Sequence, residues 1–372
     1  MMFFVVKLKK TIQNSIRSIF MKILHDDPKA LYMGRFDRTE KETKLFHAGA
    51  QVKLKFSGTS LFAVINSTIL WGTLSLGVMI DGESKEVPLS EYNNGEEITV
   101  VAAAGLDEGV HEVIIYKRHA ANQTLSLISF ETDGEFLDPD PLPELKLEVY
   151  GDSVCAGEVI DAVEYVGQCD PENHNSRFDD VWDSFVMQTA RNLNAQIHNI
   201  CQGGIAIFNG TGYFHAPDFI GLESTFDKTC YFPEGGEITD WDFGKYCPDI
   251  VIIAVGQNDK HDGINDSDDI NIADPDYRRK WKDAYKKIVK ELDGHYKNSA
   301  KFVLTTTVLM HDAEWDNAIE EIKNELNSEG IKAYHNLFSR NGAATPGHPR
   351  LPEHNEMAEE LTEFIQLIMN NE

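Results

Sequence analysis

The sequence predicts two domains: an all-β, jelly-roll-like sandwich and, after it, an α/β domain whose parallel sheet carries helices on both faces. Three observations predict this order. Short alternating strands fill the first part of the chain, a proline-rich connector follows at residues 138–143, and after it apolar strands alternate with helices. A chain of 372 residues is also long for one domain and comfortable for two.

The predicted sandwich covers residues 26–137. Residues 51–57 alternate between apolar and polar side chains, with Val52 and Leu54 on one face and Lys53 on the other, as in a half-buried strand. Clusters of asparagine, aspartate and glycine separate this strand from its successors, which is typical of an antiparallel sandwich. Further strands are expected at 61–66, 73–80, 97–102, 111–117 and 125–132.

The connector 138–143 is the predicted boundary before the second domain, residues 144–372. In that domain residues 250–255 form a continuous apolar run, typical of a parallel strand buried on both faces. Alternation of such strands with helices predicts a three-layer domain. Strands are expected at 145–150, 196–200, 250–255, 302–308 and 332–338, and helices at 181–193, 277–292, 315–327 and 353–369.

Residues 1–25 are interpreted as an N-terminal extension that is not a secretion signal. Lys7 and Lys9 interrupt its apolar start, and no small-residue cleavage site follows a sustained apolar core. No stretch of the chain approaches the roughly 20 apolar residues of a membrane span. The five cysteines show no metal-binding spacing and suit reduced thiols. We therefore expect a cytoplasmic protein, with a secreted or surface-associated one as the alternative.

The charge of the chain narrows the class of partner. There are 61 acidic residues against 34 basic ones, a formal net charge of −27. Nucleic acid and anionic membranes would be repelled by such a surface, so neither is expected as a partner. A neutral ligand such as a sugar ester fits this charge. The sequence leaves open whether the chain forms a homo-oligomer.

Polar residues follow three of the predicted parallel strands. Gly151-Asp152-Ser153 follows the first strand, Gly203-Gly204 the second, and Gly256-Gln257-Asn258-Asp259 the third. Ligands of open α/β sheets bind at the carboxyl ends of the strands, so these segments should meet at one edge. Gly347-His348-Pro349 precedes the last predicted helix. A hydroxyl nucleophile, a histidine base and polar donors for an oxyanion are the groups that acyl transfer requires.

From about residue 145 onward, these segments resemble the SGNH, or GDSL, hydrolase superfamily, whose four sequence blocks supply serine, glycine, asparagine and histidine. A β-sandwich in front of such a hydrolase is similar to carbohydrate esterase family two, which removes acetyl groups from plant polysaccharides. The resemblance implies that Ser153 is the nucleophile and His348 the base. It also implies that the backbone N–H groups of Ser153 and Gly204 and the amide of Asn258 form the oxyanion hole.

The chain departs from that pattern at one position. The superfamily carries an acid three residues before the histidine, where this chain has Thr345. A histidine base needs its second nitrogen occupied to hold the right tautomer, and a backbone carbonyl, Thr345 or a more distant carboxylate could occupy it. We expect a Ser153–His348 dyad without an orienting carboxylate. His354 is the rival base, and its alternative role is that of a solvent-facing residue at a helix start.

Long loops at 158–178 and 208–241 leave the strands that carry the site, and such loops supply specificity. Their aromatic residues Phe208, Tyr213 and Trp241 are candidates for stacking on a sugar, although for each of them loop packing is the simpler role. No metal or cofactor is expected, because no pair of ligands has the spacing of a metal site.

The sequence thus predicts a serine esterase that removes O-acetyl groups from acetylated xylan or mannan oligosaccharides through an acyl-enzyme. Two alternatives stay open. One is an esterase, lipase or thioesterase with a longer acyl group, and the other is an inactive carbohydrate-binding protein.

Overall fold

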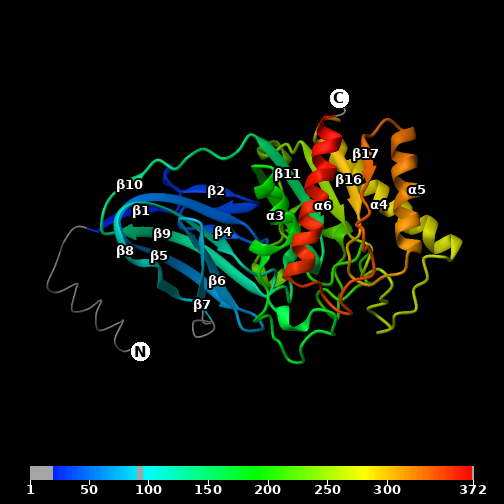
Figure 1. Cartoon of the computed structure of the whole chain (residues 1–372), viewed down its shortest axis with the longest axis horizontal. Coiled ribbons are helices and arrows are strands. Elements are labelled where there is room, and N and C mark those ends of the chain that lie inside the picture. Colours follow the sequence, from blue (N-terminus) through cyan, green and yellow to red (C-terminus); the bar gives the residue numbers. More distant parts are fainter. Residues whose placement is uncertain (1–19, 90–94, 371–372) are drawn as a thin grey trace.

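The computed structural model describes residues 20–89 and 95–370, which form two domains packed side by side (Figure 1). It confirms the predicted fold class, an antiparallel β domain followed by a parallel sheet with flanking helices. Most of the predicted N-terminal extension lies outside the described residues. Its last part differs from the prediction, because Met21–Leu24 is strand β1 and pairs with β9 in the first sheet.

The first domain is one ten-stranded antiparallel sheet that folds over on itself. Its core is a cluster of buried aliphatic and aromatic side chains, including Leu54, Ile65, Ile115 and Phe130. The strands are β1 (Met21–Leu24), β2 (Leu31–Met33), β3 (Phe36–Arg38), β4 (Thr43–Leu45), β5 (Gln51–Ile69), β6 (Ser75–Ile80), β7 (Glu83–Pro88), β8 (Glu97–Lys117), β9 (Gln123–Thr132) and β10 (Phe136–Leu137).

Two long strands, β5 and β8, each replace two shorter strands that the sequence predicted. Their pairing shifts register between Gly58 and Ser60, where Gly58 opposes Gly109 and Ser60 opposes Ala104. The extra residues of β8 form a bulge, which bends and twists a strand without ending it. The first half of β5 pairs with β2 and the second half with β9, so one pair of strands runs through both layers of the sandwich. Turn residues therefore marked a bend here and not a strand end.

The second domain contains a five-stranded parallel sheet in the order β12-β11-β15-β16-β17. The first strand in sequence, β11, lies between β12 and β15, so its carboxyl end adjoins both of theirs. The strands are β11 (Leu145–Gly151), β12 (Ala195–Cys201), β15 (Ile250–Ala254), β16 (Lys301–Thr305) and β17 (Ala333–His335). A small hairpin of β13 (Lys228–Cys230) and β14 (Thr239–Asp240) lies in the loop between β12 and β15.

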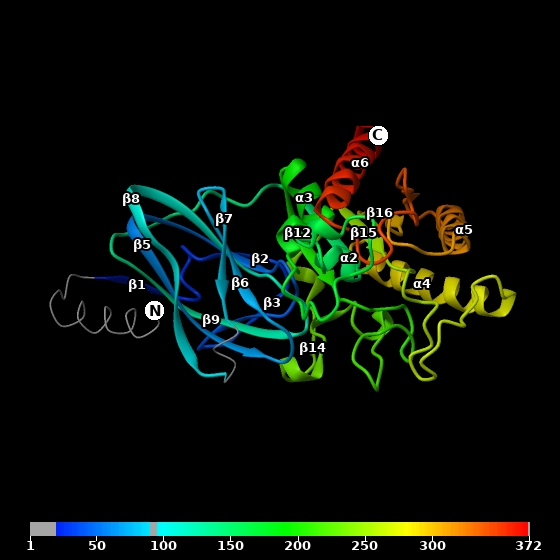
Figure 2. The same cartoon turned by 60° about the horizontal axis from the view of Figure 1, so that its bottom comes forward.

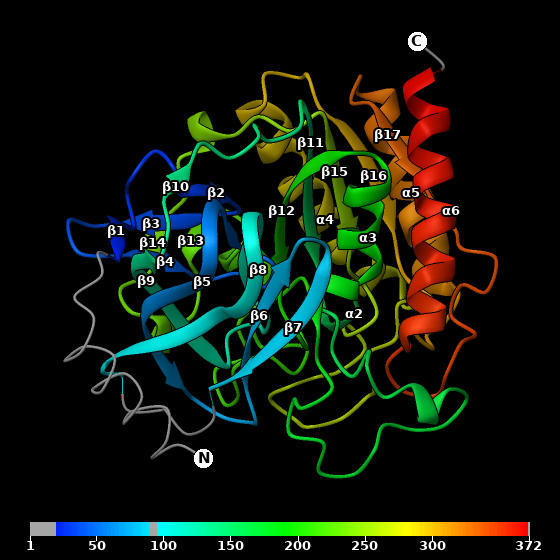
Figure 3. The same ribbon diagram turned by 60° about the vertical axis from the view of Figure 1, so that its left-hand side comes forward.

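Helices cover both faces of this sheet, as Figure 3 shows for α3 and α6 on one face and α4 behind it. Alternate residues of β15 face opposite cores: Ile252 lies in the core with α3 and α6, and Ile253 in the core with α4 and α5. The helices are α2 (Ser153–Ala156), α3 (Phe185–Asn192), α4 (Pro275–His295), α5 (Glu314–Ser328) and α6 (Leu351–Asn370). The helix predicted over 181–193 is interrupted at Ser184, whose backbone is extended.

The two domains lie side by side, as Figure 2 shows from below, and buried side chains join them. Arg35 of the first domain donates to Glu148 of β11 at 3.0 Å and to the hydroxyl of Tyr150, and the side chains of both Arg35 and Glu148 are fully buried. Residues 138–144 belong to neither sheet and run between β10 and β11. Among the described helices, none combines the length and apolar character that a membrane span requires.

Candidate active site

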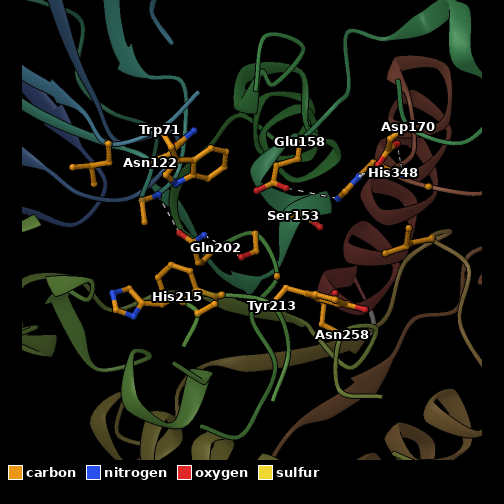
Figure 4. A pocket seen from close by; sticks show the side chains of 18 of the residues that line it. Trp71, Asn122, Ser153, Glu158, Asp170, Gln202, Tyr213, His215, Asn258 and His348 are labelled. Carbon is orange, nitrogen blue, oxygen red and sulfur yellow. Dashed lines mark hydrogen bonds and ion pairs between the residues drawn. The ribbon is translucent and has the colours of Figure 1, made fainter. Parts of the chain in front are cut away.

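Four segments distant in the sequence meet at the carboxyl edge of the parallel sheet. Ser153 follows β11, Gly204 follows β12, Asn258 follows β15, and His348 lies just before α6. All four line one cavity with a volume of about 830 Å³. Figure 4 shows Ser153 and His348 facing this cavity together, with Asn258 on its lower wall. The structure therefore brings together all of the residues expected to do the chemistry.

Ser153 is held at the start of the one-turn helix α2. The side chain of Asp152 caps this turn by accepting the backbone N–H of Val154 at 3.0 Å, and Gly157 ends it in the left-handed conformation with φ 71°. The second oxygen of Asp152 accepts the side-chain amide of Gln257 at 2.6 Å. These bonds tie the serine turn to the end of β15. Ser153 is 3% exposed, so only its cavity side is open to a ligand.

His348 is oriented by a carboxylate, which corrects the predicted dyad. Its Nδ1 lies 2.7 Å from Oδ2 of Asp170, and its backbone N–H donates to Oδ1 of the same residue at 3.0 Å. Arg350 donates to that Oδ1 at 2.8 Å and holds the carboxylate in place. Figure 4 shows the imidazole between Asp170 on one side and the cavity with Ser153 on the other. The histidine–aspartate pair is arranged as in a serine–histidine–aspartate triad, and Ser153 lines the same cavity.

The charges around His348 set its protonation. Burial alone lowers the pKa of His348, but its hydrogen bond to Asp170 and the charge of Glu158 outweigh burial and raise it above 6.5. Burial opposes the ionisation of Asp170, yet the bonds from His348 and Arg350 hold its pKa well below the usual 3.8. Asp170 is thus an anion at neutral pH, and it stabilises the imidazolium that forms when His348 takes a proton.

Thr345 does not orient His348, and His354 does not face the cavity as a base. The hydroxyl of Thr345 bonds to Glu353 at 2.9 Å and accepts the N–H of Gly167, so Thr345 braces the loop and not the imidazole. His354 is fully buried on α6, where its Nδ1 accepts the N–H of Phe185 at 3.0 Å. Its expected solvent-facing position is wrong. Burial lowers the pKa of His354 to about 3, so it stays neutral in the core.

Two backbone N–H groups are available for an oxyanion. Within the part of the chain that the structure describes, the N–H groups of Ser153 and Gly204 donate to no protein acceptor. Gly204 has φ 74°, and a Cβ there would lie 2.8 Å from the Cβ of Tyr213, so glycine is required. The side-chain nitrogen of Asn258 donates to Asp152 at 3.3 Å and to the carbonyl of Ile205 at 3.2 Å. Asn258 lines the cavity, and because its side-chain nitrogen already has two protein acceptors, its place in an oxyanion hole stays a prediction.

The cavity has walls from both domains. Leu70, Trp71, Ala121 and Asn122 come from the sandwich, and Trp71 is 56% exposed. Opposite them, His215 lies 3.1 Å from a carboxylate oxygen of Glu234. Figure 4 shows Trp71 and Asn122 at the end of the cavity away from His348. The β-sandwich therefore forms part of the cavity wall.

Only one of the three predicted aromatic binding residues lines the cavity. Tyr213 does so, and its hydroxyl donates to Asp268 at 3.0 Å. Trp241 is buried at the domain interface, 5.3 Å from the guanidinium of Arg35. Phe208 packs against Tyr277 in the core around α4. For these two residues loop packing is the observed role, because the loop folds back on its own domain.

Sequence reasoning missed Asp170, Glu158 and Trp71. Asp170 and Glu158 lie in a loop recognised as long and close to the site, but a contact across 178 residues of sequence leaves no local pattern. Trp71 lies in the turn between β5 and β6. A tryptophan between two predicted strands was the one signal in the sequence that could have marked it. Among the described residues, no group of three or more histidine, cysteine, aspartate or glutamate side chains is arranged to hold a metal ion.

Comparison with known proteins matches both domains. Residues 32–141 match the family model described as Carbohydrate esterase 2 N-terminal. A protein of Acetivibrio thermocellus named Cellulase/esterase CelE is 28% identical over 358 residues, which are 92% of this chain and 40% of that protein. A protein of Cellvibrio japonicus named Acetylxylan esterase / glucomannan deacetylase is 29% identical over 367 residues, 96% of this chain and 93% of the relative. The chain thus spans less than half of the first relative and nearly all of the second.

The fold has solved counterparts. A family two carbohydrate esterase from Clostridium thermocellum, solved with cellohexaose, has a TM-score of 0.76 at 26% identity and covers 92% of this chain and 99% of its own. The acetyl xylan esterase Est2A from Butyrivibrio proteoclasticus has a TM-score of 0.78 at 20% identity, covers 95% of this chain and 99% of its own, and is a likeness of fold.

Proposed function

We infer that this chain is a carbohydrate esterase of family two. Its N-terminal domain matches the model of that family, and its relatives and structural neighbours bear the names of carbohydrate esterases. The resemblance that the sequence motifs indicated is confirmed by these comparisons. The chain is a carboxylic ester hydrolase that removes acetyl groups from oligosaccharides. The single observation that carries this function is the cavity shared by Ser153, His348 and the two free N–H groups.

The proposed reaction passes through an acyl-enzyme. Ser153 Oγ attacks the acetyl carbonyl carbon while His348 Nε2 takes the hydroxyl proton, and Asp170 stabilises the resulting imidazolium. The carbonyl oxygen becomes an anion held by the N–H groups of Ser153 and Gly204. His348 then returns the proton to the sugar oxygen, which leaves. Water, activated by the same histidine, attacks the acetyl-serine and releases acetate.

The proposed substrates are acetylated xylan or mannan fragments. The names of the relatives support this choice, since one is called an acetylxylan esterase and glucomannan deacetylase. The cavity supports it by its chemistry: an exposed Trp71 offers a face for a sugar ring, and Asn122 and the His215–Glu234 pair offer hydrogen bonds. An acidic protein of net charge −27 also accepts a neutral sugar more readily than an anion.

Substitution Ser153→Ala tests the mechanism. It should lower the kcat for an aryl acetate by at least about 10⁴-fold, because removal of a triad nucleophile leaves only the oxyanion contacts. The unfolding midpoint should stay near that of the wild type. The substitution removes only the hydroxyl of Ser153, and among the described residues no protein group depends on that hydroxyl for a hydrogen bond. Unchanged turnover in this variant would reject Ser153 as nucleophile.

The alternative functions meet less support. An inactive binding protein was suggested by the missing acid before His348, and the contact with Asp170 removes that reason. A longer acyl group is tested by comparing acetate with octanoate esters of the same alcohol. A higher kcat/KM for octanoate would overturn the acetyl assignment.

The cytoplasmic location and the oligomeric state stay predictions. All five cysteines are free, which suits a reducing compartment. Fractionation of the source cells checks the location, and light scattering of the purified chain checks the oligomeric state.

A further inference from the structure

The side chain of Gln202 bonds to the peptide group that carries one of the two oxyanion donors. Gln202 directly follows β12, and its Nε2 donates to the carbonyl of Gly203 at 3.0 Å. That carbonyl and the N–H of Gly204 belong to one trans peptide group, so they lie in one plane and point in opposite directions. Gln202 therefore bonds to the far end of the peptide whose N–H we assign to the oxyanion hole.

The amide of Gln202 is itself held by two donors. Its Oε1 accepts the backbone N–H of Ala121 at 3.0 Å and the hydroxyl of Tyr231 at 2.7 Å. Because the N–H of Ala121 can only donate and the carbonyl of Gly203 can only accept, these bonds determine which end of the amide faces the glycine. Gln202 is 6% exposed, and Figure 4 shows it below Asn122, with a hydrogen bond drawn toward the sandwich. The amide thus has one orientation in the fold.

The carbonyl of Gly203 depends on this bond. Within the ranges 20–89 and 95–370, Gln202 is its only hydrogen-bond donor. Both residues of the Gly203–Gly204 peptide lack a Cβ, so sterics alone restrict the rotation of its plane only weakly. A hydrogen bond to a peptide carbonyl also polarises the peptide, which makes its N–H a stronger donor. The amide of Gln202 can therefore both orient and strengthen the N–H of Gly204.

We propose that Gln202 is a positioning residue of the oxyanion hole, which holds the Gly204 N–H toward the developing oxyanion and is itself anchored by the sandwich through Ala121. The inference rests on the proposed esterase function. Ala121 lies in the turn between β8 and β9, so the first domain would support the reaction through this bond. An oxyanion donor acts where charge develops, and its orientation should therefore affect the transition state more than the binding of the ester.

Substitution Gln202→Met keeps the length of the side chain and removes both ends of the amide. It should lower kcat for an aryl acetate by about 10- to 100-fold, a part of the roughly 10²- to 10³-fold that loss of a whole donor costs. KM should stay within about twofold of the wild type, because the ester itself is bound by other groups. Unchanged kcat, or a loss confined to KM, would overturn the inference. The near-UV circular dichroism spectrum checks that the variant is folded.

Gln188→Met is the matched control. Gln188 on α3 also donates its side-chain amide to a backbone carbonyl, that of Asp183 at 2.7 Å, and it lies outside the cavity. The kcat and KM of this variant should match those of the wild type. A kcat as low as that of Gln202→Met would mean that any lost glutamine bond slows the enzyme, and the specific role of Gln202 would be rejected.

Gln202→Glu gives a readout that a merely structural role would not move. A protonated carboxyl can donate to Gly203 and accept from Ala121, whereas a carboxylate has no hydrogen to donate. The kcat of this variant, divided by that of the wild type at the same pH, should therefore rise as the pH falls from about 8 to about 5, since burial raises the pKa of a carboxyl group into this range. The same ratio for Gln202→Met should stay constant. A constant ratio in Gln202→Glu would contradict the proposal.

Inhibition by methylboronic acid measures the oxyanion hole without turnover. Its boron accepts the oxygen of the serine hydroxyl and becomes a tetrahedral anion, which resembles the reaction intermediate. The inhibition constant should rise in Gln202→Met by about the factor by which kcat/KM falls. An inhibition constant equal to that of the wild type would show that the oxyanion hole is intact and would exclude this role. Failure of the esterase function is recognised separately, by an active Ser153→Ala variant.

Discussion

At the scale of single residues, the proposed reaction depends on how His348 is oriented toward the cavity that it shares with Ser153. Asp170 holds Nδ1 at 2.7 Å, and the N–H of the same histidine and Arg350 both bond to the other carboxylate oxygen. These three bonds hold the imidazole with Nδ1 toward Asp170 and Nε2 toward the cavity. Because Asp170 already accepts these bonds before substrate arrives, no reorganisation is required during the reaction.

Substitution Asp170→Asn should lower kcat for an aryl acetate by about 10³- to 10⁴-fold, since an amide favours the wrong tautomer of His348. The bond to Asp170 also raises the pKa of His348, so the acid limb of the profile should move to lower pH. Initial rates between pH 5 and about 8 measure both effects. Asp269→Asn, at an exposed aspartate, is the control that should match the wild type. Near-normal turnover in Asp170→Asn would mean that Ser153 and His348 act as a dyad without Asp170.

At the scale of elements, α4 anchors the loop that carries Asn258. The carboxylate of Asp259 accepts the indole N–H of Trp281 at 2.7 Å and the backbone N–H of Ile207 at 2.9 Å. One buried carboxyl thus joins α4, the loop after β12 and the end of β15. Burial raises the pKa of Asp259 to about 6, so between about 4 and 6 the folded chain binds more protons than the unfolded one. Across that interval this group lowers the unfolding free energy as the pH rises.

Substitution Trp281→Phe should cost more than its loss of volume. It leaves Asp259 with one donor fewer in a site closed to water, a loss of about 1–3 kcal/mol in unfolding free energy beyond packing. Trp315→Phe is the matched control, because its ring lies 5.1 Å from that of Trp281 in the same core. Urea unfolding of both variants gives the difference. Equal destabilisation would mean that the bond to Asp259 contributes nothing.

At the scale of the whole molecule, the sandwich positions the catalytic loop. Arg118, just after β8, donates to Asp161 at 2.7 Å and lies 3.4 Å from Asp180, and both carboxylates belong to the segment that carries Glu158 and Asp170. Asn122 bonds to Ser176 in the same segment at 3.2 Å. The loop that carries Asp170 is therefore held in place from the neighbouring domain, so we expect the sandwich to affect catalysis as well as binding.

The domain interface should also dominate stability. Substitution Arg35→Met leaves Glu148 as a buried charge without its ion-pair partner, and it removes the donor to the carbonyls of Phe226 and Lys228. We expect a loss of about 3–5 kcal/mol in the free energy of unfolding. The surface variant Arg38→Met should cost less than about 1 kcal/mol in the same urea titration. A small loss in Arg35→Met would mean that the two domains unfold independently.

Substrate binding across the interface is tested at Trp71. Trp71→Ala should lower kcat/KM for acetylated xylo-oligosaccharides about 5- to 30-fold relative to an aryl acetate, as expected for loss of about 1–2 kcal/mol of apolar contact. The loss should appear mainly in KM. Met310→Ala, which removes a side chain with the same 56% exposure outside the cavity, is the control. An unchanged ratio would confine binding to the α/β domain.

The sequence by itself determined the fold class, the four segments around Ser153, Gly204, Asn258 and His348, and their meeting at one edge. Each of these follows from local information: apolar runs, turn residues, and the rule that neighbouring parallel strands end side by side. The same local rules wrongly divided β5 and β8 into two strands each, because the residues typical of a bulge are also typical of the turn at the end of a strand.

Only the tertiary structure decided which acid orients His348, which carboxyl adjoins its other nitrogen, and which aromatic ring lines the cavity. Asp170, Glu158 and Trp71 reach the site from loops and from the other domain. Contacts of this kind depend on how two folded domains pack, and packing joins residues whose positions in the sequence have no regular spacing. Trp241 and Phe208 illustrate the converse, because loops near a site can turn their aromatic residues into the core.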